Sequence, residues 1–111
     1  MRKVLQHVVI FKLKDTFTDE LTSSAITQLA AVVKANEGII AASFGKNETS
    51  LYDTYRQHAG GFTHTLIVTF VDERALKNYD TEPEHLKLGG IIIPHMEEAV
   101  ATDTWIDTYP D

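Results

Sequence analysis

The feature that most constrains the fold is a stretch near the N-terminus that is apolar on both faces of a strand. Residues 4–14 are rich in β-branched and other apolar side chains, which predicts a β-strand. One set of alternating positions includes Val9 and Phe11, and the other includes Val8 and Ile10. A small sheet with helices on one side buries only one of these faces. Something else must therefore cover the second face.

The rest of the chain predicts three more strands and three helices. The predicted strands are residues 39–46, 62–71 and 98–107. The predicted helices are residues 18–36, residues 72–79 and a segment that begins at Pro83 and breaks between Gly89 and Pro94. A polar loop is predicted from Asn47 to Gly61. This order predicts one α+β domain over residues 1–111, a ferredoxin-like sandwich with a four-stranded antiparallel sheet and its helices on one face. The other face is most simply covered by a second copy, as a homodimer.

Composition restricts the partners. The formal net charge is −6 at pH 7, the wrong sign for general binding to nucleic acid or to an anionic membrane. Cysteine is absent, which excludes disulfides and thiolate metal ligands. No apolar run is long enough to span a bilayer, and the first residues lack the pattern of a signal peptide. These features predict a cytoplasmic protein without nucleic-acid or membrane partners.

Four segments occur in the order and spacing of one known family. They are His7–Lys14, Phe44–Lys46, Gly61–Phe70 and Tyr79–His85. On these segments, and over nearly its whole length, the chain resembles the stress-responsive dimeric α/β-barrel domain. The resemblance implies a homodimer whose two sheets form a barrel with the helices outside. The family includes plant polyketide cyclases, which close a linear polyketide by aldol condensation without a cofactor.

The same resemblance implies a catalytic pair. The tyrosine and histidine of the cyclases fall on Tyr79 and His85, and a strand histidine near their pocket falls on His7. Glu82 departs from the pattern, because the family usually has a histidine before the proline. The Gly89–Gly90 pair also departs, since bulkier residues are common there. Both departures leave the shape of the pocket and the substrate open.

These residue types fit proton transfer next to a carbonyl group. A histidine near a helix start can act as a base, and a tyrosine hydroxyl can donate to the carbonyl oxygen. We therefore predict that His85 and Tyr79 face one apolar cavity for a small apolar or aromatic carbonyl ligand. The predicted walls are His7, Val9, Leu66, Met96 and Asp103, with Asp103 hydrogen-bonded to His7 and the first and last strands paired about residues 9 and 102. Tyr79→Phe is expected to cost at most about 1–2 kcal/mol of stability.

The remaining histidines give no metal-binding motif. His64 begins a strand antiparallel to that of His7, so the two should lie at opposite ends of the sheet, and we interpret His64 as a buried structural residue. His58 and His95 are interpreted as peripheral. The sequence contains no H-x-x-x-H or H-x-D spacing and no Gly-rich phosphate loop. We therefore predict neither a transition metal nor an organic cofactor.

Other functions stay open at this point. His85 and Tyr79 are also compatible with a capping residue and a core residue in a non-catalytic, stress-protective dimer. A monooxygenase-like barrel would use quinone or haem chemistry, although the sequence pattern places no axial ligand. Chemical change of a bound ligand distinguishes an enzyme from a binding protein, and an absorbance scan distinguishes a haem protein from both.

Overall fold

The structure, a computed structural model, describes residues 2–51 and 59–110. Its elements are β1 (Arg2–Leu13), α1 (Asp19–Ala35), β2 (Ile39–Lys46), β3 (His64–Phe70), α3 (Glu73–Thr81), α4 (Pro83–Ile92), the 3-10 turn η1 (Ile93–His95) and β4 (Met96–Thr108). Every strand and helix predicted from the sequence is present. Part of the predicted loop, residues 52–58 with His58, lies outside the described residues.

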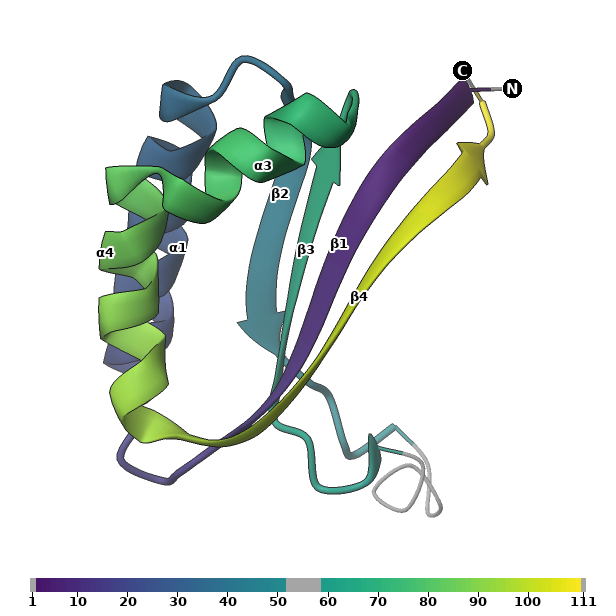
Figure 1. The fold of residues 1–111 in the computed structure, drawn as a ribbon. Helices are drawn as coiled ribbons and strands as arrows, with labels where there is room; N and C mark the ends of the chain where they lie inside the picture. Colours follow the sequence, from purple (N-terminus) through teal and green to yellow (C-terminus); the bar gives the residue numbers. More distant parts are fainter. Residues whose placement is uncertain (1, 52–58, 111) are drawn as a thin grey trace.

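The four strands form one antiparallel sheet in the order β2-β3-β1-β4. Helices α1, α3 and α4 all lie on the same face of this sheet, and the two termini lie together at one end (Figure 1). This arrangement confirms the predicted ferredoxin-like α+β fold. None of the helices in the described part of the chain is long and apolar enough to cross a membrane.

The core lies between the sheet and the helices. Val4 and Leu5, near the start of β1, are both buried. From Val9 to Leu13 the buried side chains of β1 are those at alternating positions, and β3 alternates in the same way from His64 to Phe70. This period of two is typical of strands that bury one face against helices. The helices contribute an apolar stripe that includes Leu29 of α1, which is 4% exposed.

The helix ends are fixed by side-chain caps and by proline. The Thr18 hydroxyl accepts from the N–H of Leu21, and the Asp72 carboxylate accepts from the N–H of Ala75. Helix α4 ends at Ile92, within the predicted interval, because Pro94 cannot continue it.

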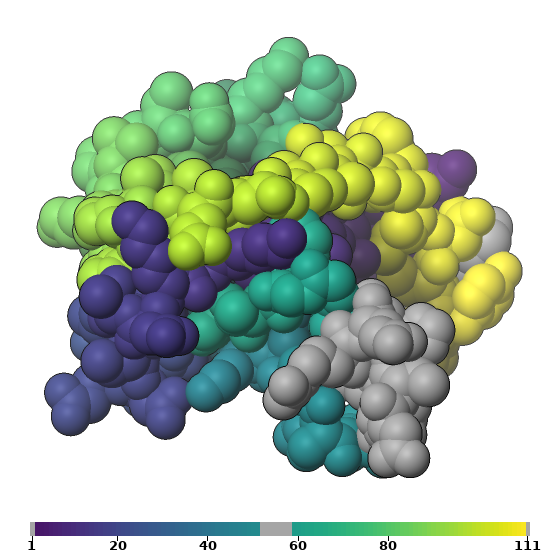
Figure 2. Space-filling view, turned by 90° about the horizontal axis from the view of Figure 1, so that it is seen from below, coloured from purple at the N-terminus to yellow at the C-terminus, as the bar shows by residue number. Residues whose placement is uncertain are grey.

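The turn after α4 is tied to the end of β1. The backbone N–H of Lys14 donates to the carbonyl of His95 at 2.8 Å. Figure 2 shows this end of the molecule, where the start of β4 lies against the connection between β1 and α1. The contact fixes the point at which β4 enters the sheet.

The pairing of β1 with β4 differs by one residue from the prediction. Val9 pairs with Ala101, not with Thr102, and His7 pairs with Asp103. Directly opposed residues of an antiparallel pair share a face of the sheet. The predicted register is therefore wrong by one residue, whereas the predicted contact of Asp103 with His7 on the pocket face is confirmed.

Candidate active site

Three rings from three elements meet between the sheet and the helices. Tyr79, in the last turn of α3, is only 2% exposed. Its ring centroid lies 3.9 Å from that of His85 on α4 and 5.7 Å from that of His7 on β1. Phe70, at the end of β3, lies 5.3 Å away. Tyr79, His85 and His7 are called the ring cluster below.

The turn between α3 and α4 brings two members of the ring cluster together. Glu82 is the C-cap of α3 and the N-cap of α4, with extended backbone angles of φ −65° and ψ 129°. Its N–H donates to the carbonyl of Tyr79 at 3.2 Å, and its carboxylate accepts from the N–H of Glu84 at 3.0 Å. Pro83 occupies the first helical position, where a missing N–H has no consequence. The departure from the family pattern at Glu82 is thus a helix cap.

A polar pair on β1 and β4 completes the cluster. The Nδ1 atom of His7 lies 2.7 Å from Oδ1 of Asp103, its direct partner in the strand register. An ionised carboxylate only accepts hydrogen bonds, so Nδ1 donates. A neutral His7 consequently keeps its lone pair on Nε2.

The ring cluster lies between two adjoining hollows and lines both. The inner chamber, of about 240 Å³, is otherwise lined by Val9, Phe11, Leu66, Leu88, Gly89, Ile92, Ile93, Met96 and Ala99. The outer recess, of about 460 Å³, is otherwise lined by Leu76, Lys77, Asp80 and Asp103. The lining of the inner chamber is almost entirely apolar, whereas that of the outer recess combines apolar surface with two carboxylates and an ammonium group. A ligand in the inner chamber therefore meets polar groups only at the ring cluster.

The hydroxyl of Tyr79 is buried and has no hydrogen-bond partner among the described residues. A buried polar group without a partner costs free energy, so such groups are rare in folded proteins. Burial raises the pKa of Tyr79 far above its ordinary value, and the nearby charges of Asp80 and Asp103 raise it further. The group is therefore a hydrogen-bond donor that stays protonated at neutral pH.

The surroundings of His85 favour its neutral form. Burial lowers its pKa, although the carbonyl and the charge of Asp80 act in the opposite direction. Its Nδ1 lies 3.4 Å from the carbonyl oxygen of Asp80, which can only accept. Nδ1 therefore carries the hydrogen, and Nε2 of the neutral ring is the proton acceptor.

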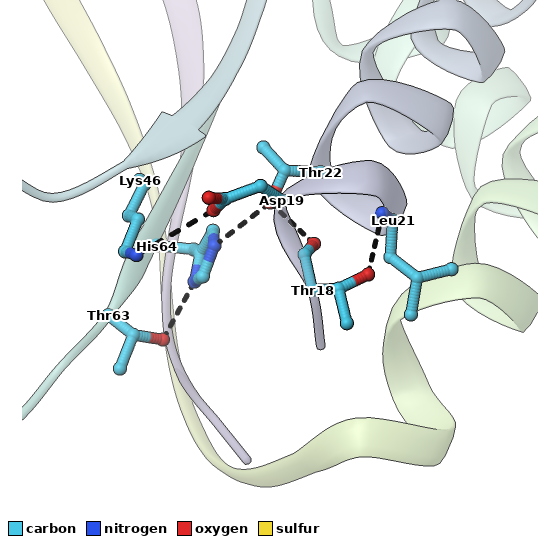
Figure 3. Close-up of polar contacts among 7 residues, drawn as sticks. All are labelled: Thr18, Asp19, Leu21, Thr22, Lys46, Thr63 and His64. Atoms are coloured by element: carbon cyan, nitrogen blue, oxygen red, sulfur yellow. Dashed lines mark hydrogen bonds and ion pairs between the residues drawn. The ribbon is translucent and has the colours of Figure 1, made fainter. Parts of the chain in front are cut away.

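His64 lies apart from this site. Figure 3 shows its ring between Thr63 and Thr22, with Nδ1 at 2.8 Å and Nε2 at 3.2 Å from the two hydroxyls. It is 4% exposed and stacks on Phe44. In the register, His64 pairs with Phe11 of β1, four residues along the strand from His7. His7 lies in the middle of β1, so the prediction that the two histidines lie at opposite ends of the sheet is wrong, whereas the burial of His64 agrees with its interpretation as a structural residue.

The free energy of unfolding is expected to fall as the pH decreases below about 6.5, the ordinary histidine pKa. Burial lowers the pKa of both His64 and His85 in the folded protein. The unfolded chain therefore binds protons that the folded chain does not. The stabilising contribution is complete above the ordinary pKa and is lost as the pH falls through the lowered values.

Urea unfolding at about pH 7.5 and about pH 5.5 measures this dependence. A His64→Gln variant, which keeps a polar group between the two threonine hydroxyls, should lose part of it. An unchanged pH dependence in this variant would contradict the contribution of His64.

All seven predicted site residues line the two hollows. The ring cluster lines both, Val9, Leu66 and Met96 line the inner chamber, and Asp103 lines the outer recess. Their roles in catalysis or ligand binding stay predictions. The sequence did not lead to a prediction that Asp80, Leu76 and Lys77 line the outer recess, although Asp80 directly follows Tyr79.

No group of three or more metal-ligating side chains comes together within residues 2–51 and 59–110. His95, interpreted as peripheral, hydrogen-bonds to the hydroxyl of Thr16 at 2.7 Å through Nδ1. The absence of a cofactor or a transition metal stays a prediction.

Fold and site together define a class of protein: a ferredoxin-like α+β domain with a cavity between the sheet and the helices, at which a tyrosine and two histidines meet. The sequence profile of the stress-responsive A/B barrel domain matches residues 5–106. The chain belongs to this family.

Solved structures of the same fold span nearly the whole chain. A dimeric ferredoxin-like protein of unknown function from Thermobifida fusca has a TM-score of 0.75 and 22% identity, covering 96% of this chain and 93% of its own. A hydroxynitrile lyase from Passiflora edulis has a TM-score of 0.75 and 20% identity, covering 96% and 97%. A possible oxidoreductase from Bacteroides thetaiotaomicron has a TM-score of 0.68 and 15% identity, covering 95% and 98%. No curated protein matches the sequence.

Proposed function

We propose that this protein is a cofactor-free lyase or cyclase that binds a small carbonyl compound with an apolar body. The observation that carries the proposal is the Tyr79 hydroxyl, which is buried, has no partner among the described residues and belongs to a side chain that lines the cavity. A ligand carbonyl that accepts from this hydroxyl would satisfy it. The apolar inner chamber would take the body of the same ligand.

The reaction proposed is proton transfer next to the carbonyl group. Nε2 of His85 takes a proton from the adjacent carbon, and the electron pair of the broken C–H bond forms a C=C bond. The carbonyl π electrons move onto oxygen, which accepts from the hydroxyl of Tyr79. Nε2 of His7, oriented by Asp103, offers a second acceptor at the same end of the cavity.

One protein of the same fold and one sequence resemblance support a lyase or cyclase, while another protein of the fold is named as a possible oxidoreductase. A protein with the same fold is named as a hydroxynitrile lyase. The chain also resembles the polyketide cyclases, whose catalytic tyrosine and histidine fall on Tyr79 and His85. A cytoplasmic location, in keeping with the absence of cysteine, belongs to the same proposal.

The test is a screen of uncharged aldehydes, ketones and cyanohydrins by thermal shift, followed by NMR of each ligand after incubation with the protein. We expect at least one compound to raise the midpoint of unfolding and to be converted to a product. A screen without any binding compound would count against the proposal.

The second candidate is a stress-protective dimer that binds a ligand without converting it. It is favoured by the ring contact of 3.9 Å between Tyr79 and His85, which a purely structural pair would also make. In this case a ligand would bind and be recovered unchanged.

We further propose that two copies associate through the face of the sheet that the helices leave uncovered. That face carries Val8 and Ile10 of β1, Ile67 of β3 and Val100 of β4, of which Val100 is 48% exposed. The helices lie only on the other side (Figure 1). An exposed apolar surface across several strands is typical of an interface. The relative from Thermobifida fusca is described as dimeric.

Ile67→Glu is expected to dissociate the dimer, because it would bury a charge without a partner in the interface. Light scattering should give about twice the mass of one chain for the parent and a lower mass for the variant, with circular dichroism reporting whether the variant folds. Leu86→Glu is the matched control, since Leu86 is 61% exposed on α4, on the other side of the sheet. A parent that scatters as a single chain would contradict the proposal.

A further inference from the structure

The outer recess carries more negative than positive charge. Its ionisable lining groups, apart from the ring cluster, are Asp80 and Asp103, which are acidic, and Lys77, which is basic. The ammonium of Lys77 lies 3.1 Å from the carboxylate of Glu73, one turn earlier on α3. Lys77 is therefore paired with a carboxylate outside the recess, and Asp103 is hydrogen-bonded to His7. Asp80 makes no side-chain hydrogen bond or ion pair with the described residues, so its charge is left beside the ring cluster.

The position of Asp80 in its helix gives a second, independent observation. Asp80 lies in the last turn of α3, a turn that contains no basic residue. The negative end of the α3 dipole lies there, but the positive end of the α4 dipole begins two residues later at its N-cap Glu82, so the two dipoles act on the carboxylate of Asp80 in opposite directions. Helix stability therefore does not account for this charge. The carbonyl of Asp80, which holds His85, would be supplied by any residue at this position.

We infer that the outer recess excludes anionic ligands, that Asp80 sets this preference, and that the substrate is consequently an uncharged carbonyl compound. The inference rests on the proposed function, because it concerns the ligand that would reach the hydroxyl of Tyr79. It adds a charge requirement that the apolar inner chamber alone does not impose.

The physical reason lies in what the two carboxylates do at the ring cluster. They oppose negative charge on the oxygen of Tyr79, which is why their charges raise its pKa. A ligand that arrives with a charged oxygen beside this hydroxyl meets the same opposition. The enolate oxygen of the proposed reaction differs, because its charge forms together with the positive charge of His85 that has taken the proton. The two carboxylates weaken the binding of a neutral carbonyl only slightly. A carboxylate ligand is repelled strongly, because it brings a full negative charge into a partly desolvated site.

The probes are benzylacetone, a methyl ketone, and hydrocinnamate, a carboxylate. Both carry a phenylethyl group on a carbonyl carbon, and they differ only in that the ketone has a methyl group where the carboxylate has its second oxygen. Calorimetric titration at low ionic strength measures both dissociation constants. We expect the parent to bind the ketone at least about tenfold more tightly than the carboxylate. Asp80→Asn should reduce this ratio by about three- to tenfold, chiefly by tightening the carboxylate, and added salt should reduce it in the parent.

Asp15→Asn is the matched control. It removes the same charge from an exposed residue that lines neither hollow, so the ratio should stay at the parent value. Asp103 is unsuitable as a variant here, because it also orients His7.

The outcomes separate this inference from the proposed function. Equal binding of the two probes by the parent overturns the inference and leaves the proposed function in place. A ratio that Asp80→Asn leaves unchanged overturns the assignment to Asp80. Failure of both probes to bind the parent counts against the proposed function and overturns the inference with it.

Discussion

A Tyr79→Phe variant is expected to lose turnover by about a hundredfold or more, the typical effect of removing one donor to a developing oxyanion. Its stability should equal or exceed that of the parent. The Tyr79 hydroxyl has no partner among the described residues, so its removal breaks no hydrogen bond there. Burying an unsatisfied hydroxyl costs about 1–3 kcal/mol, and the phenylalanine avoids part of this cost. The structure thus reverses the sign of the small loss that the sequence alone leads one to expect.

The combination of these two results is what identifies a functional group. If Tyr79 served only in packing, Tyr79→Phe would lower the free energy of unfolding and leave turnover unchanged. We expect turnover to fall and the free energy of unfolding to stay the same or rise. Tyr109→Phe is the matched control, since Tyr109 is 74% exposed and lines neither hollow. Urea unfolding and a turnover assay on the compound from the screen measure both quantities. Parent-like turnover by Tyr79→Phe would remove this tyrosine from the mechanism.

Much of the fold follows from patterns that are local in the sequence. The period of two in β1 and β3, the caps at Thr18 and Asp72 and the proline at the start of α4 each mark an element independently of the rest of the chain. The ends of strands are less local. β3 begins at His64, two residues later than predicted, although the N–H of Thr63 still donates to the carbonyl of Phe11 at 2.7 Å.

The site was predictable where it depends on chain direction and on the turn at Pro83. It was less predictable where it depends on register, because nothing local to β1 or β4 distinguishes Ala101 from Thr102 as the partner of Val9. Asp80 was missed for a similar reason. Its exposed side chain is typical of ordinary helix surface in the sequence, and only the fold, which places residues of α3 around one recess with His7 of β1 and Asp103 of β4, makes it part of a site.

Gly38→Ala is expected to be among the most destabilising single substitutions in the chain. A Cβ at Gly38 would overlap with the Cβ of Ala75, which is buried on α3 and cannot move without the helix. Overpacking of this kind costs about 1–3 kcal/mol. Movement of α3 away from Gly38 would also strain two hydrogen bonds of Asn36. Its side chain donates to the carbonyl of Ala75 and accepts from the N–H of Gly38, each at 2.9 Å, and each bond is worth about 1 kcal/mol.

Because Ala75 and Tyr79 are one turn apart on α3, displacement at Gly38 should also move the ring cluster. Gly90→Ala is the control, since a Cβ there meets nothing within 4 Å and alanine stabilises a helix interior by about 0.5–1 kcal/mol relative to glycine. Urea unfolding should therefore shift in opposite directions for the two variants. A Gly38→Ala protein as stable as the parent would mean that β2 and α3 can separate at little cost. The packing of α3 would then not be rigid enough to hold Tyr79 against His7 and His85.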